Sequence, residues 1–358
     1  MTSALFSPFK LGTFELANRL VMAPMTRNRA AVDGRPTASM VTYYGQRASA
    51  GLIITEGAQP SAVGQAYPHT PGLHNAEQAA AWRLVTDAVH AKGGVIFLQI
   101  MHAGRISHPD NQPGGGLPIA PSAVAPAGQI VTPTGPQDMV TPRALETHEI
   151  AGVIADYVTC ATLAVEQAGF DGVEIHGANG YLPQQFLAEG SNTRTDAYGG
   201  SATNRARFVV EIAQAVTAAI GAERVGIRLS PANTFNDIAE ADPAATYAAV
   251  LEGLAPLGLA FVHLVEGSRE LTAQIRAAYT GVLIVNAAFS LDTTRTNLET
   301  FLAEDRFDLV AVGRAFIANP DLVARLAVDA ELNPADGATF YGGTDAGYTD
   351  YPALGSAA

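Results

Sequence analysis

Eight short apolar runs, rich in β-branched residues, recur along the chain and are separated by longer stretches. They lie at residues 20–23, 52–55, 95–100, 172–175, 225–229, 261–265, 282–285 and 309–312. Between them, apolar residues recur with the spacing of amphipathic helices at 77–92, 147–168, 205–220 and 243–257. Strands that alternate with helices build parallel βαβ units. Eight such units predict an α/β fold of the (β/α)8 TIM-barrel type, although periodicity leaves an open, doubly wound sheet as the alternative.

The length of the chain suits one barrel rather than several domains. Its 358 residues are in the range of barrels with insertions, and 48% of them are hydrophobic while 15% are charged. This composition is typical of a large core whose strands are buried on both faces. We therefore expect a single domain over residues 1–358, with a frayed tail at 353–358.

One connection is much longer than the others. Residues 104–147 are rich in proline and glycine and follow the third apolar run, so they should lie over the C-terminal mouth of the barrel. A loop of this length in a compact domain is usually either functional or disordered. We expect a lid or pocket wall, with disorder as the alternative. The aromatic, glycine-rich segment at 337–352 is expected to pack against the body of the protein.

Charge and cysteine content limit the partners of the protein. A formal net charge of −13 argues against nucleic acid, which needs a basic face, and against anionic membrane surfaces. Cys160 is the only cysteine, so an intrachain disulfide is excluded and we expect a buried, inert thiol. Neither a signal peptide nor a run as long as a membrane span is apparent. We expect a cytoplasmic protein that is monomeric or homodimeric.

Polar residues follow directly after the predicted strands. In barrels of this type the C-terminal strand ends build the active site, so these residues should meet at one mouth. Each alone has a structural explanation, such as an ion pair for Arg228, but their coincidence at one rim favours a functional site. They are Thr26, Gln99, His176, Asn179, Tyr181, Arg228, Gly313 and Arg314.

The spacing of His176, Asn179 and Tyr181 indicates chemistry on a substrate oxygen. Two neutral donors can converge on one oxygen and stabilise the negative charge that develops there. A tyrosine stays protonated at neutral pH and can donate a proton. The competing use of His176 as a metal ligand lacks partners, because no histidine or carboxylate accompanies it at zinc spacing. We therefore predict no metal site.

The loops after the last two strands predict a phosphate site, since barrels commonly bind phosphate there. Ala287, Ala288 and Gly313 are small enough for their backbone N–H groups to approach an anion. Arg314 can add a bidentate charged contact. A phosphorylated cofactor or substrate is therefore expected.

Several distinctive motifs are spread along almost the whole chain, and each occurs once. They are APMTR at 23–27, YYGQRA at 43–48, QIMHAGR at 99–105, HGANGYLPQQFL at 176–187, SNTRTDAYGGSATNRARF at 191–208 and VGRAFIANP at 312–320. Together they resemble the old yellow enzyme family of NADPH-dependent flavin oxidoreductases. Within that family the sequence is most similar to the bacterial N-ethylmaleimide and nitrate-ester reductases.

The resemblance implies a noncovalently bound FMN at the mouth of the barrel. Thr26 would bind flavin O4 and Gln99 the pyrimidine edge. Arg228 would lie near N1, where its positive charge favours the reduced ring. The backbone along the ring would belong to Ala23, Pro24, Met25 and Ala58, and the phosphate cradle to Ala287, Ala288, Gly313 and Arg314.

The resemblance also implies a reaction. Hydride from NADPH or NADH passes through flavin N5 to the β carbon of an activated alkene, such as an enone, enal, maleimide or nitroalkene. His176 and Asn179 would bind the activating oxygen, and Tyr181 would protonate the α carbon. The residues near the substrate would be Tyr67, Tyr341 and Met101, the last in place of a tryptophan that is usual in close relatives.

Other interpretations meet specific obstacles. Dienoyl-CoA reductases share this barrel but add an iron–sulfur cluster, which a single cysteine excludes. A phosphate-binding aldolase would need a lysine at a strand end, and none of the eight predicted strands carries one there. Two alternatives stay open: an enzyme that acts mainly on nitrate esters or nitro compounds, and a flavin-binding barrel with little turnover.

Overall fold

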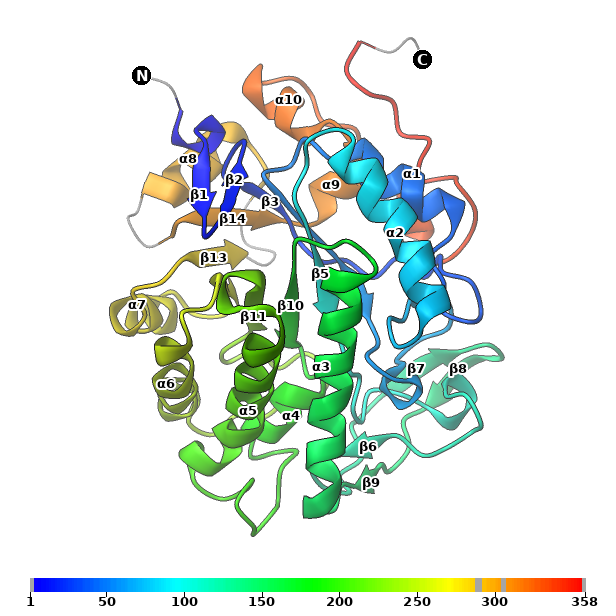
Figure 1. Ribbon diagram of the computed structural model, residues 1–358, viewed down its shortest axis with the longest axis vertical. Helices are drawn as coiled ribbons and strands as arrows, with labels where there is room; N and C mark the ends of the chain where they lie inside the picture. Colours follow the sequence, from blue (N-terminus) through cyan, green and yellow to red (C-terminus); the bar gives the residue numbers. More distant parts are fainter. Residues whose placement is uncertain (1–2, 287–291, 304–306, 356–358) are drawn as a thin grey trace.

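A closed barrel of eight parallel strands forms the centre of the computed structural model, which describes residues 3–286, 292–303 and 307–355 (Figure 1). The strands follow one another around the barrel in chain order, and each predicted run forms one of them. The sheet is therefore closed rather than open. The strands are β3 (Leu20–Met22), β4 (Leu52–Ala58), β5 (Ile96–Ile100), β10 (Gly172–Gly177), β11 (Val225–Leu229), β12 (Phe261–Val265), β13 (Leu283–Asn286) and β14 (Leu309–Val312).

Helices surround the barrel, and the four predicted ones are confirmed (Figure 1). Their starts follow capping chemistry: Asn75, Ser201 and Asp242 each accept a backbone N–H of the first turn. The helices are α1 (Ala38–Gln46), α2 (Ala76–His90), α3 (Ile150–Glu166), α4 (Leu182–Leu187), α5 (Ala202–Ile220), α6 (Pro243–Leu254), α7 (Arg269–Ala278), α8 (Arg295–Ala303), α9 (Arg314–Ala318) and α10 (Leu322–Ala327).

The stretch Thr147–Glu166, which contains α3, corrects one expectation. By length and hydropathy alone it could cross a membrane, whereas the sequence was expected to contain no such run. Its apolar face, which includes Tyr157 and Cys160, is buried, and α3 contacts α5, β5 and β10. Because burial raises the pKa of the Cys160 thiol, it stays protonated, as expected for an inert cysteine.

An apolar cluster fills the end of the barrel where the strands begin. Phe97 and Phe261 come from strands that are not neighbours, and their rings lie 5.7 Å apart across the interior. The hairpin of β1 (Phe9–Leu11) and β2 (Phe14–Leu16) contributes Leu11 and Leu16 to the same cluster. We call this cluster the floor of the barrel; its other buried members are Val21, Leu52, Ile54, Ala260, Ile284, Leu309 and Ala311, and it extends to Ala23, which follows the end of β3.

The long connection after β5 contains two small sheets of its own (Figure 1). β7 (Gln129–Thr132) and β8 (Gly135–Asp138) form an antiparallel hairpin, and β6 (Ile119–Ala120) pairs with β9 (Arg143–Ala144). The side chain of Ile130, on β7, is buried against Met101 and Tyr181. The insertion thus contacts residues of the predicted site.

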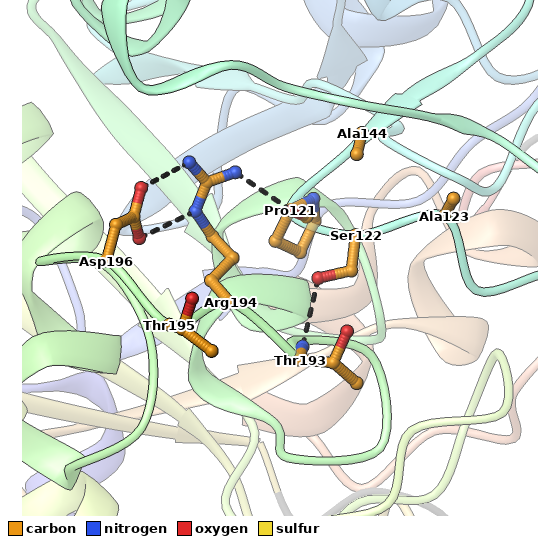
Figure 2. A pocket seen from close by; sticks show the side chains of 8 residues that line it. All are labelled: Pro121, Ser122, Ala123, Ala144, Thr193, Arg194, Thr195 and Asp196. Carbon is orange, nitrogen blue, oxygen red and sulfur yellow. Dashed lines mark hydrogen bonds and ion pairs between the residues drawn. The ribbon is translucent and has the colours of Figure 1, made fainter.

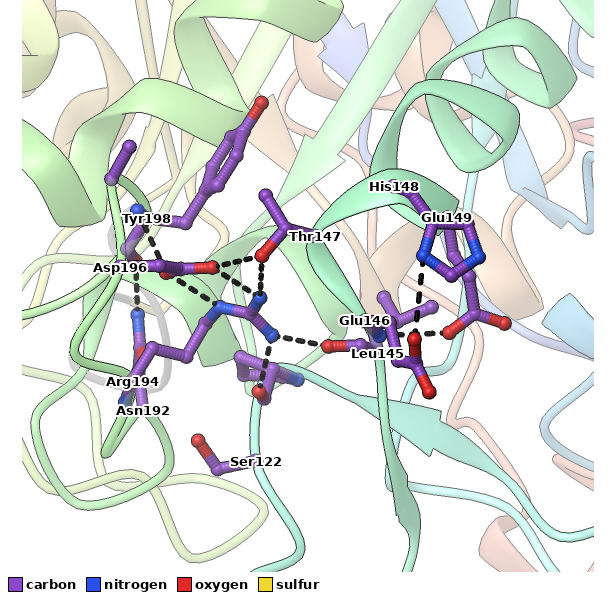
Figure 3. A network of polar contacts seen from close by, with 12 residues as sticks. Ser122, Leu145, Glu146, Thr147, His148, Glu149, Asn192, Arg194, Asp196 and Tyr198 are labelled. Atoms are coloured by element: carbon purple, nitrogen blue, oxygen red, sulfur yellow. Dashed lines mark hydrogen bonds and ion pairs between the residues drawn. The ribbon is translucent and has the colours of Figure 1, made fainter.

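Arg194, in the loop before α5, forms hydrogen bonds with this insertion (Figure 3). Its guanidinium forms an ion pair with Asp196 and donates to the carbonyl oxygens of Pro121 and Leu145. Thr147 donates to the same Asp196 carboxylate. An open cavity of about 360 Å³ lies beside this network and contains none of the residues predicted to bind flavin or substrate (Figure 2). It is lined by Pro121, Ser122, Ala123, Ala144, Thr193, Arg194, Thr195 and Asp196.

The segment at 337–352 packs against the chain that follows β3, as expected. Arg27 donates to the carbonyl oxygens of Phe340, Thr339 and Gly347. Tyr348 is fully buried and stacks on Tyr43, with ring centroids 4.1 Å apart. This packing brings the C-terminal segment, which carries Tyr341, to the side of the barrel where β3 ends.

Candidate active site

The register of the barrel brings the predicted polar residues to one end. His176 on β10 is paired with Arg228 on β11, and Glu174 is paired with Gln99 on β5. Because all eight strands are parallel, the segments that follow β3, β4, β10 and β14 open at this same end. We call this end the mouth.

His176 is held as a neutral hydrogen-bond donor. Its side chain is buried, and its Nδ1 accepts the backbone N–H of Ala178 at 3.3 Å, which leaves the ring proton on Nε2. Burial, with the nearby positive charge of Arg228, lowers the pKa of His176 well below its usual value. The imidazole therefore offers an N–H without carrying a charge.

Asn179 and Tyr181 lie in a tight turn between β10 and α4. Asn179 has φ of +54° and Gly180 of +78°, a region that glycine and asparagine tolerate best. The Asn179 N–H donates to Ser230 Oγ at 2.8 Å, and the ring centroid of Tyr181 lies 5.0 Å from that of His176. The turn thus places the ring of Tyr181 beside His176 and holds the backbone of Asn179 against the residue that follows β11.

Tyr181 is protonated over the whole physiological range. Burial raises the pKa of its hydroxyl well above the usual value, and the neighbouring Tyr67 adds to the effect. The two hydroxyl oxygens lie 3.4 Å apart. A phenol that is held neutral in this way can donate a proton to a substrate atom.

Two asparagines in the loop after β11 were not predicted. Asn236 donates to the backbone oxygen of Asn179 at 2.8 Å and also forms a hydrogen bond with Tyr181. Asn233 Nδ2 lies 3.4 Å from Asn179 Oδ1. Both follow the end of the fifth barrel strand, so the rule that selected the other candidates could have found them.

Arg228 supplies a buried cation at the mouth. Its side chain is 7% exposed, and its Nε has no hydrogen-bond partner among the described residues. Burial lowers the pKa of the guanidinium, and the nearby Glu174 carboxylate partly offsets that effect. A buried donor with an unmet hydrogen bond fits an electron-rich ligand group such as the pyrimidine edge of a flavin.

The segments predicted to line the flavin also meet at the mouth. The Ala23 N–H donates to Val312 at 3.0 Å, which joins the segment Ala23, Pro24, Met25 and Thr26 to the end of β14. A Cβ added to Gly313 would lie 3.4 Å from Met25 Sδ, so the predicted ring and phosphate segments are neighbours. Ala58 is buried at the end of β4, and Arg314 begins α9. Ala287 and Ala288 lie outside the described residues.

The predicted substrate residues are divided between the interior and the surface. Met101 is 2% exposed and shares an apolar cluster with Tyr181 and Ile130, against which Tyr67 packs. Its Sδ would lie 2.7 Å from a Cβ on Gly57, so it covers the backbone just before Ala58. Tyr341 is 69% exposed, yet it is near enough to add slightly to the raised pKa values of Tyr67 and Tyr181, which burial chiefly causes. It therefore lies at the outer rim of the same site.

Acidic and histidine side chains do not gather into a metal site within the described part of the chain. The site consists instead of neutral donors, one buried cation and a buried amide, all at the mouth of a (β/α)8 barrel. Neutral donors and a buried cation at the mouth of such a barrel are the groups that enzymes use to bind electron-rich ligand atoms.

Sequence comparison identifies the family. The chain belongs to the NADH:flavin oxidoreductase / NADH oxidase family, whose sequence model matches residues 4–333. The chain is 44% identical to a probable flavin mononucleotide-dependent alkene reductase of Leishmania infantum, over 97% of each chain.

Solved structures agree with this assignment. Morphinone reductase in complex with tetrahydroNAD has a TM-score of 0.93 and 45% identity, over 98% of both chains. The old yellow enzyme homologue of Zymomonas mobilis has a TM-score of 0.94 and 38% identity, over 98% of this chain and all of the other. The old yellow enzyme family predicted from the motifs is thereby confirmed, and the protein is a flavin oxidoreductase.

Proposed function

We propose that this protein is an FMN-dependent ene-reductase, which uses a nicotinamide nucleotide to reduce the carbon–carbon double bond of an activated alkene. The observation that supports it most directly is the neutral His176, which lies beside the protonated Tyr181 and is paired with Arg228, with Asn179 in the turn that follows. Relatives named as alkene reductase and morphinone reductase support the same activity.

The residues present fit noncovalent FMN. Arg228 has an unmet buried donor, and Gln99 has an amide that is only partly used within the barrel. Ala23 is joined to the end of β14 and Met25 lies close to Gly313, so the segments proposed to line the flavin are neighbours; Thr26 follows in the first of them. When bound there, FMN supplies hydride chemistry, from the nicotinamide to the β carbon of the alkene.

The protein side chains prepare the alkene for that hydride. The Nε2–H of His176 and the amide of Asn179 donate to the carbonyl or nitro oxygen, where negative charge grows during reaction. Tyr181 delivers its hydroxyl proton to the α carbon. Because His176 and Asn179 are uncharged, they stabilise the developing charge without forming an ion pair with the product, and Tyr181 regains its proton from solvent.

The substrates that suit this geometry are enones, enals, maleimides and nitroalkenes, each with an oxygen conjugated to the double bond. The lid proposed for the insertion would cover them, since Ile130 already contacts Met101 and Tyr181. We propose NADPH as the physiological reductant and test NADH beside it.

The test is to purify the protein, denature it and identify the released chromophore, then to assay NADPH and NADH oxidation with 2-cyclohexenone. The proposal expects about one FMN per chain and nicotinamide oxidation that matches formation of cyclohexanone. Protein that neither retains nor rebinds FMN would overturn it. Nicotinamide oxidation without any saturated ketone would overturn the alkene activity alone.

A further inference from the structure

A group of three linked polar side chains lies inside the barrel, above the apolar floor. Glu174 on β10 joins Gln99 on β5 to His263 on β12. Gln99 Nε2 donates to Glu174 Oε1 at 2.8 Å, and Glu174 Oε2 lies 2.7 Å from His263 Nδ1. The side chains of Glu174 and His263 are completely buried. None of the steps proposed above uses Glu174 or His263.

Stability alone does not account for this arrangement. Desolvation of a carboxylate is unfavourable, and apolar side chains of similar volume in place of buried charged groups often leave a protein equally stable or more so. The floor below consists of such apolar side chains. The position of Glu174 in the next layer, one hydrogen bond from Gln99, therefore points to the ligand of Gln99.

We propose that Glu174 is a positioning residue for the flavin: it fixes the amide of Gln99 and places a negative charge in the barrel interior that opposes Arg228. This inference rests on the proposed FMN site. It has two consequences, one for cofactor affinity and one for the midpoint potential of the flavin.

The first consequence follows from hydrogen-bond chemistry. A carboxylate only accepts hydrogen bonds, so the NH2 side of Gln99 must face Glu174 and its Oε1 must face away. The pyrimidine edge of a flavin carries one N–H donor between two carbonyl acceptors. An amide fixed with Oε1 and one N–H outward matches a donor and an adjacent acceptor, whereas a freely rotating amide matches them only part of the time.

The second consequence follows from charge. Burial lowers the pKa of His263, so this histidine is neutral and donates to Glu174 without cancelling its charge. Arg228, paired with His263 in the register, is the cation that favours a negatively charged reduced ring. Glu174 acts against it, and its removal should make the flavin easier to reduce.

The test compares Glu174→Gln with the wild-type holoprotein. We expect the Kd for FMN, measured by titrating apoprotein, to rise about tenfold, since a charge-assisted hydrogen bond is lost. We expect the midpoint potential to rise by about 30 mV, which corresponds to a tenfold shift for a two-electron couple. Arg228→Ala should move the potential in the opposite direction.

Two further variants make the result specific. Glu174→Asp keeps the charge but withdraws the carboxylate, so the Kd should rise while the potential stays at the wild-type value; this variant decides the matter if Glu174→Gln does not fold. Glu211→Gln removes a carboxylate on α5 that binds Tyr198, outside the barrel, and should change neither quantity.

The outcomes separate the two proposals. Wild-type protein without FMN binding would overturn the proposed function. FMN binding with an unchanged or lower potential in Glu174→Gln would overturn this inference alone, as would an unchanged Kd in Glu174→Asp.

Discussion

The two ends of the barrel interior are built on opposite principles. At the floor, Phe97, Phe261 and their neighbours form a cluster of buried apolar side chains. At the mouth, β5, β11 and β10 carry Gln99, Arg228 and His176, and the Nε of Arg228 has no hydrogen-bond partner among the described residues. Side chains at the floor should therefore affect mainly folding, and side chains at the mouth mainly ligands. Substitutions at each end of the barrel test this division.

Tyr181→Phe should separate chemistry from stability most clearly. Reduction of the flavin by NADPH needs no proton from this residue and should stay near the wild-type rate. Reoxidation by 2-cyclohexenone should slow by about 10²–10⁴-fold, because a positioned general acid is lost. Stopped-flow absorbance measures the two half-reactions separately. Equal slowing of both half-reactions would mean that Tyr181 has a structural role only. A nitroalkene, whose product can be protonated in water, serves as the control substrate.

Leu52→Ala should lower the stability of the fold and leave FMN binding unchanged. Leu52 is fully buried in the floor, and truncation of a core leucine typically lowers the free energy of unfolding by about 2–5 kcal/mol. Denaturant unfolding measures this loss. The Kd for FMN of the folded fraction should not change. A large loss of FMN affinity at full stability would remove the distinction between floor and mouth.

Arg228→Ala should weaken FMN binding about tenfold or more and lower the flavin potential. One charge-assisted contact is worth about 1.5–3 kcal/mol. Since the Nε of Arg228 lacks a partner, the apoprotein should lose little stability. Apoprotein titration, spectroelectrochemistry and melting temperature report the three quantities. Unchanged affinity and potential would contradict the assignment of Arg228 to the flavin.

Met101→Trp should have the smallest and most selective effect. Met101 packs on Gly57 and Tyr181, so an indole there should crowd β-substituted enones by about 1–3 kcal/mol, by analogy with overpacking a core. Unhindered maleimides should be affected less. The same assay measures which enantiomer of the product is formed. A uniform fall in kcat/KM with a lower melting temperature would indicate a packing role only.

Much of this architecture was readable from the sequence because it depends on local pattern. Each β-branched run formed a strand, and the polar residues after them reached one mouth because parallel strands end together. The role of Glu174 could not be predicted from the sequence of the strand Gly172–Gly177, because a carboxylate inside an apolar strand does not indicate its partners. Its bonds to Gln99 and His263 depend on how strands distant in the chain are staggered around the barrel.

Other features could not be predicted from the sequence, for related reasons. Asn233 and Asn236 act through contacts with a turn that lies more than 50 residues earlier in the chain, as their separations of 54 and 57 positions show. The stretch that contains α3 has the hydropathy of a membrane span because one face packs against the barrel and the other is rich in small residues. The mean hydropathy of the stretch averages over the two faces, and only the fold shows which face is buried.

The measurement that tests the central claim most directly is an anaerobic titration of the FMN-loaded wild-type protein. NADPH should bleach the flavin absorbance near its visible maximum, and 2-cyclohexenone added next should restore it, with one cyclohexanone formed per flavin. Flavin that is bleached by NADPH but restored by none of the enone, maleimide and nitroalkene substrates would contradict the account.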